Sequence, residues 1–132
     1  MKSINTILGL FILTVITVSC SSDDSGCSRD GVCTLEFRTI VVEVLDSNGN
    51  RVNFDEFTVT NLQTGERVEL EWEQGDLYPI ADDSMTNDIP QGGQQFELVG
   101  FIGGFEVLRQ VYLVGSDCCH IVLLDGDTTV RI

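Results

Sequence analysis

Short runs of alternating apolar and polar residues fill the chain from residue 33 onward, and this alternation limits the folds open to it. In residues 67–72, Val68, Leu70 and Trp72 alternate with charged side chains. A period of two places alternate side chains on one face of a strand, whereas a helix needs a period near 3.6. The pattern therefore predicts strands.

Turn residues separate these runs at the spacing typical of a β-sandwich. A change of parity near Arg38 and Thr39 indicates a bulge or a bend, and Pro79 limits its strand to an edge or a strand start. The sequence predicts an all-β fold, a seven- to eight-stranded antiparallel β-sandwich. The expected strands are residues 33–45, 57–61, 67–72 (a hairpin partner of the preceding one), 77–81, 94–101, 105–114, 118–124 and 128–132.

The first 19 residues look like an export signal. Lys2 supplies a positive end, and residues 7–18 are apolar apart from one glycine and two threonines. A bilayer-spanning helix needs about 20 apolar residues, so this stretch fits the core of a signal peptide. We expect residues 1–19 to be removed. An ordinary secretory signal and a retained membrane helix are the alternatives.

Ser19 and Cys20 resemble the lipobox of bacterial lipoproteins, although Thr17 stands where leucine is usual. The resemblance implies cleavage before Cys20 and lipidation of its thiol. Each buried methylene adds about 0.8 kcal/mol of membrane affinity, so two or three acyl chains attach a protein durably. The expected partner of this end of the chain is a membrane.

Residues 20–26 are predicted to be the lipidated cysteine and a polar, acidic tether. The sequence CSSDD resembles the export signal of surface lipoproteins in Bacteroidota. It implies an outer-membrane lipoprotein exposed on the cell surface, with the periplasmic face as the alternative. A plain solvated linker has a similar composition.

The remaining four cysteines are an even number, as an oxidising compartment favours. Neighbours on a strand point to opposite faces, so Cys118 and Cys119 are poorly placed to bridge each other. We prefer Cys33–Cys119 with Cys27–Cys118 over the other connectivities. Each bridge closes a loop of more than eighty residues. A metal site is the alternative reading of residues 117–120, but no C-x-x-C spacing supports it.

Three segments together resemble the transthyretin-like, carboxypeptidase-regulatory type of β-sandwich, whose architecture is also immunoglobulin-like. They are residues 44–50, residues 58–65 and the late run DCCHI at 117–121. The last resembles a D-x-C-H-[VI] strand of small Bacteroidota lipoproteins. The length of the chain predicts a single domain, over residues 27–132. The resemblance implies that this domain serves as an accessory, binding or structural module.

The charge of the chain excludes one class of partner. The chain has 21 acidic and 7 basic residues, and Lys2 lies in the leader. Such a surface repels phosphate backbones, so we expect no nucleic acid partner.

Few residues offer catalytic chemistry. His120 is the only histidine, and no G-x-S-x-G elbow accompanies it. We expect a strand histidine that is hydrogen-bonded to a neighbour, with no catalytic residue and no cofactor.

Two residue sets are weaker candidates for binding. Carboxylates in residues 81–93 could bind calcium, although no EF-hand spacing is present. Five aromatic side chains could line a ligand face or fill the core. The calcium candidates are Asp82, Asp83 and Asp88, with Ser84 and Asn87 nearby, and the aromatic residues are Trp72, Tyr78, Phe101, Phe105 and Tyr112.

These observations predict a lipid-anchored extracytoplasmic module that is not an enzyme. It would bind a partner protein, a glycan or an envelope component. The alternatives are a hydrolase that uses acidic residues and a purely structural envelope subunit. Clustered acids with raised pKa in a cleft would favour the hydrolase, whereas an exposed apolar patch would favour binding.

Overall fold

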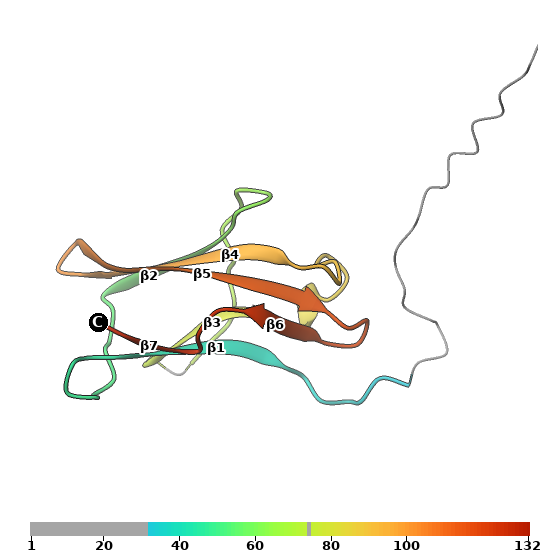
Figure 1. The fold of residues 1–132 in the computed structure, drawn as a ribbon, viewed down its shortest axis with the longest axis horizontal. Helices are drawn as coiled ribbons and strands as arrows, with labels where there is room; N and C mark the ends of the chain where they lie inside the picture. The colour runs from blue at the N-terminus through green and yellow to red at the C-terminus, as the bar shows by residue number, and fades with distance from the viewer. Residues whose placement is uncertain (1–31, 74) are drawn as a thin grey trace, which may run out of the picture.

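The computed structural model describes residues 32–73 and 75–132, which form seven strands and one 3₁₀ helix (Figure 1). The predicted leader and tether, residues 1–26, and Cys27 lie outside the described residues. The elements are β1 (Thr39–Leu45), β2 (Glu56–Asn61), β3 (Leu77–Asp82), η1 (Asp83–Met85), β4 (Gln94–Ile102), β5 (Phe105–Ser116), β6 (Ile121–Asp125) and β7 (Thr129–Arg131).

The strands form two sheets that face each other (Figure 1). One sheet has the order β3-β1-β7, and the other has the order β2-β4-β5-β6. Alternate side chains of both sheets point inward, as in Val42 and Val44 of β1 and Phe96 and Leu98 of β4, which are fully buried. This alternation is the reason that the sequence folds into two layers, and the predicted all-β sandwich is confirmed.

One pair of strands departs from the antiparallel prediction. β7 runs parallel to β1, with Glu43 opposite Thr129 and Leu45 opposite Arg131. β6 is antiparallel to β5 in the other sheet, so the chain changes sheets between β6 and β7. Parallel neighbours need a long crossover, and here the whole domain between β1 and β7 serves as that connection.

The first strand is shorter than predicted. It begins at Thr39, and residues 33–38 form no strand. Leu35 and Phe37 are exposed, so the alternation in this segment does not mark a buried face. The register of β1 with β3 shifts between Ile40 and Val41, close to the predicted position at Arg38 and Thr39 but not at it.

The predicted strand over residues 67–72 is also wrong. Its turn is present, because Gly65 lies in the left-handed region at φ 75° and Thr60 bridges Arg67. The Val68 amide donates to the Val59 carbonyl at 2.8 Å, and after that the pairing ends. The segment covers part of the β2 edge without extending the sheet.

Cys118 and Cys119 lie in a turn rather than in the predicted strand. Cys118 has φ 79°, and β6 begins only at Ile121. The Asp117 side chain causes the turn, because its Oδ1 accepts from the amides of Cys119 at 3.1 Å and His120 at 2.8 Å. Aspartate commonly forms such local bonds and competes with strand pairing. Pro79, by contrast, is in an edge strand as predicted.

Candidate functional site

A disulfide fastens the segment before β1 to the turn before β6. Cys33 and Cys119 are bonded, with their Cα atoms 5.3 Å apart, as the preferred pairing predicted. Cys118 is disulfide-bonded as well. Cys27 lies outside the described residues, so its pairing with Cys118 stays a prediction.

A polar cluster beside this disulfide, which we call the latch, joins three parts of the chain. His120 Nδ1 lies 2.7 Å from Asp83 Oδ2, and its Nε2 lies 2.8 Å from Thr34 Oγ1. The Asp83 carboxylate also accepts from the Arg38 and Ile121 amides, each at 2.8 Å. The latch therefore ties the segment before β1 to η1 and β6.

The environment of Asp83 favours its charged form. Its side chain is 8% exposed. Burial raises the pKa of Asp83, but the hydrogen bonds from His120 and the Arg38 and Ile121 amides outweigh burial and lower the pKa overall. Hydrogen bonds to a carboxylate stabilise it relative to the neutral acid. Asp83 is thus an anion that stabilises this end of the sandwich.

The latch has the order of groups found in nucleophilic triads: a hydroxyl, an imidazole and a carboxylate. The sequence predicted a strand histidine bonded to a neighbour. His120 is hydrogen-bonded, but it lies in the turn before β6, and the sequence did not indicate Asp83 or Thr34 as its partners. They lie 37 and 86 positions away along the chain. The fold brings them together because η1 and the disulfide both lie at the β6 end of the molecule.

The calcium candidates do not converge. Asp82 caps η1 by accepting from the Ser84 amide at 2.9 Å, whereas Asp83 belongs to the latch. Asp88 is exposed. Within residues 32–73 and 75–132, no group of three or more histidine, cysteine or acidic side chains is placed to hold a metal ion.

The five aromatic candidates separate into different environments. Tyr78 and Tyr112 are core residues, and Tyr78 stacks on Phe54 with the ring centroids 4.5 Å apart. Phe105 is 77% exposed at the start of β5. They therefore form no single ligand-binding face.

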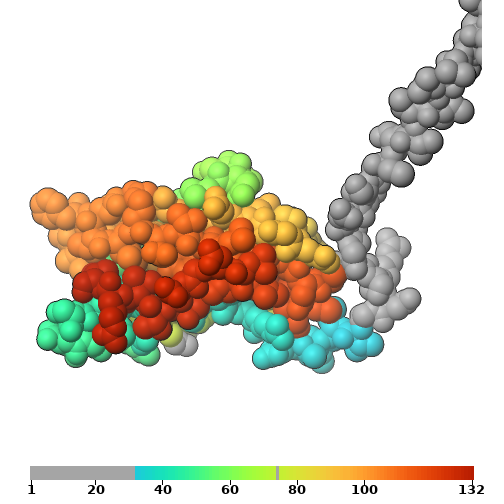
Figure 2. Space-filling model, viewed as in Figure 1, coloured from blue at the N-terminus to red at the C-terminus, as the bar shows by residue number. Residues whose placement is uncertain are grey.

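The open edge of β5 is the second notable feature. β4 pairs with β5 along almost its whole length, but β6 pairs only with its last residues, from Leu113 to Ser116. Among the described residues, no strand pairs with residues 105–112 on the β6 side. The space-filling view shows β5, in orange, at the surface above the red β6 and β7 (Figure 2).

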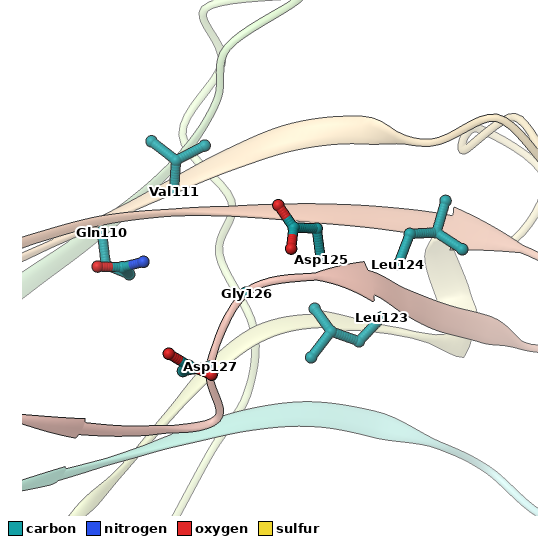
Figure 3. Close-up of a pocket in the computed structure, with 7 residues that line it drawn as sticks. All are labelled: Gln110, Val111, Leu123, Leu124, Asp125, Gly126 and Asp127. Carbon is teal, nitrogen blue, oxygen red and sulfur yellow. The ribbon is translucent and has the colours of Figure 1, made fainter.

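A hollow of about 400 Å³ lies where β6 separates from β5. Gln110 and Val111 line one side, and residues 123–127 line the other (Figure 3). Asp125 and Asp127 bring two carboxylates to this hollow, and neither forms an ion pair with another described residue. The hollow is therefore both acidic and bordered by an unpaired strand edge.

Exposed apolar side chains gather at the β4–β5 turn, far from the latch. Ile102 and Phe105 flank this turn, and Val107 follows them on β5. In Figure 1 the turn lies at the left end, whereas the residues before β1 leave at the right end. The disulfide and the latch thus lie at one end of the sandwich and this turn at the other, although Leu35 and Phe37 near the latch are exposed as well.

No family model, curated protein or solved structure matches this chain. In the part that the structure describes, no helix has the length and apolar character needed to cross a membrane.

Proposed function

We propose that this chain is the precursor of a lipid-anchored, extracytoplasmic β-sandwich module that binds a partner without catalysing a reaction. The leader and Cys20 supply the anchor, and the partner is a protein, a glycan or an envelope component. The observation that carries the proposal is the difference between the two ends of the sandwich. The disulfide and the latch fasten the segment that leads to the proposed anchor, whereas β5, which starts at the opposite end, has an unpaired edge.

The fastened end suits attachment to a membrane. The chain from Cys20 to Val32 reaches at most about 40 Å when extended. The disulfide and the latch then fix the point at which this segment meets the sandwich. A tethered domain held in this way presents its β4–β5 turn away from its attachment point.

The anchor is tested on the full chain expressed in a diderm bacterium. Mass spectrometry of the mature N-terminus should find Cys20 carrying acyl chains, and the protein should fractionate with outer membranes. Cys20→Ser should release it from the membrane fraction. An unmodified N-terminus at another residue would contradict the anchor.

Exposure on the cell surface is tested separately by adding protease to whole cells. Digestion of the protein on intact cells indicates surface display. Protection of the protein until the outer membrane is permeabilised indicates the periplasmic face. Crosslinking in the membrane would then detect a protein partner, and binding to a glycan array would detect a glycan partner. A purely structural subunit would be crosslinked only to itself or to permanent neighbours.

A hydrolase is the second candidate, because the latch places a hydroxyl, an imidazole and a carboxylate in the order of a triad. Thr34 would be the nucleophile and His120 its base. Hydrolysis of an activated ester by the full chain, abolished by Thr34→Val, would support this candidate. The same rate in wild type and variant would restrict the latch to a structural role.

A further inference from the structure

Most strand edges of this sandwich are protected. β3 contains Pro79, β6 and β7 are short, and the segment after Gly65 bridges part of β2. Proline, short length and coverage are devices that prevent a sheet from pairing with another chain. No described strand pairs with the β5 edge between residues 105 and 112, although residues 123–127 lie beside Gln110 and Val111 across the hollow.

The open edge has the length of a strand-binding site. The register with β4 is interrupted between Gly100 and Phe101, so Val107 is unpaired in that ladder. Residues 108–112 beyond it continue regularly and span about 17 Å at 3.3 Å per residue. An extended peptide could therefore form a regular antiparallel or parallel ladder with this part of β5.

The charge beside the edge favours one class of peptide. Asp125 and Asp127 border the hollow next to Gln110 and Val111, and they form no ion pair with the other described residues. The whole chain has a formal charge of −14, so a second copy would be repelled. A lysine or arginine side chain on an added strand would gain two carboxylate partners.

We propose that the open edge of β5 binds an extended, basic segment of a partner protein. The segment pairs with residues 108–112 as an added strand and places a cationic side chain in the hollow at Asp125 and Asp127. This inference rests on the proposed binding role and names the class of partner. The ladder supplies affinity, and the acidic hollow supplies the preference for basic sequences.

The test uses the detergent-solubilised full chain and fluorescein-labelled octapeptides of alternating lysine and threonine. Fluorescence anisotropy should show saturable binding of this peptide. The same sequence with N-methyl groups on every residue has equal charge but cannot form a ladder, and it should bind at least tenfold more weakly. An octapeptide of alternating glutamate and threonine should not bind.

Two protein variants locate the site. Asp125→Asn with Asp127→Asn should weaken binding of the lysine peptide by about threefold or more. Glu71→Gln with Glu73→Gln removes the same charge from an exposed segment elsewhere and should leave binding within twofold. Equal loss in both variants, or equal binding of the N-methylated peptide, would mean that only overall charge attracts the peptide and would overturn the inference.

Sedimentation of the full chain without peptide tests the competing occupant. A concentration-dependent dimer that the lysine peptide cannot dissociate would assign the edge to a second copy and overturn the inference. These outcomes are independent of the anchor, because the release of the Cys20→Ser variant from the membrane fraction is measured without any peptide. Failure of peptide binding therefore leaves the proposed membrane attachment standing.

Discussion

Asp83 connects three parts of the chain through one carboxylate, so its replacement should have a large effect. Asp83→Asn should lower the free energy of unfolding at pH 7 by about 2–3 kcal/mol, because charged hydrogen bonds are worth more than neutral ones. Denaturant titration of the variant and of Asp88→Asn, an exposed control, measures this cost.

The pH dependence of this effect has a definite sign. The pKa of Asp83 in the folded protein lies below the ordinary value of 3.8. Its contribution to the free energy of unfolding is therefore fully present above pH 3.8. It is lost as the pH falls through the folded-state pKa. The stabilities of wild type and Asp83→Asn should therefore converge as the pH falls below 3.8. A constant difference from pH 7 to pH 2 would contradict this assignment.

Tyr78 and Tyr112 are both buried, but within the described part of the chain only the Tyr78 hydroxyl has hydrogen-bond partners. It donates to the Val52 carbonyl at 2.7 Å and accepts from the Phe54 amide at 2.9 Å. The Tyr112 hydroxyl has no hydrogen-bond partner among the described residues, and burial, then the charge of Asp127, raises its pKa. A buried polar group without a partner is costly, whereas a bonded one is costly to remove.

Phenylalanine substitutions should separate the two tyrosines. Tyr78→Phe should lower the free energy of unfolding by about 1–2 kcal/mol, and Tyr112→Phe should leave it unchanged or raise it by up to about 1 kcal/mol. Thermal denaturation of both variants checks the difference. Destabilisation by Tyr112→Phe as large as that by Tyr78→Phe would show that the Tyr112 hydroxyl is bonded in solution.

At the scale of elements, the sequence predicted the strands well where alternation coincides with burial. β2, β4 and β5 begin within a residue of their predicted starts, because their apolar positions fill the core. Residues 33–38 alternate as well, but a disulfide and the latch hold them instead of a ladder. Alternation alone does not distinguish these two situations, since both place apolar side chains at every second position.

The candidate sites were less predictable than the strands. The sequence favoured the Cys33–Cys119 bridge over the other connectivities on the premise that Cys118 and Cys119 are neighbours on a strand, whereas both lie in a turn. The open edge of β5 exists because β6 is much shorter than β5 and pairs only with its last residues. No local sequence signal marks the point at which β6 separates from β5. Pairing between distant segments is decided by the packing of the whole domain.

The turn between β6 and β7 depends on Gly126. Its φ of 116° lies where residues with a Cβ are strained, and an added Cβ would lie 2.5 Å from Tyr112 Cδ1. Gly104 also has a positive φ, of 79°, but its Cβ position is open. Comparing alanine at the two positions separates the backbone cost from the steric one.

Gly126→Ala should lower the free energy of unfolding by about 2–4 kcal/mol, because overpacking adds to backbone strain. Gly104→Ala should cost only about 1 kcal/mol. Denaturant titration of the pair measures both values. Equal costs would mean that the Tyr112 ring moves aside without penalty and that only the backbone matters.

The whole molecule closes through two links between its beginning and its end. β7 pairs with β1, and Cys33 is bonded to Cys119 across a separation of 86 residues. The sequence predicted the bridge but not the parallel pairing, because β7 is only three residues long and carries no signal for strand direction. Of the two links, only the disulfide persists in the unfolded chain, and a bridge that closes a long loop restricts that chain most strongly.

Removal of the bridge should therefore have the largest effect of any change considered. Cys33→Ser with Cys119→Ser should lower the free energy of unfolding by about 4–5 kcal/mol on the chain-entropy model. For a domain near 100 residues, this corresponds to a fall in melting temperature of roughly 15–30 °C. Thr34→Val keeps the bridge, removes one hydrogen bond of the latch and should cost about 1 kcal/mol. If the double serine variant melts within a few degrees of wild type, β1–β7 pairing and the core close the sandwich without the bridge, and the segment before β1 is an attachment rather than a structural part.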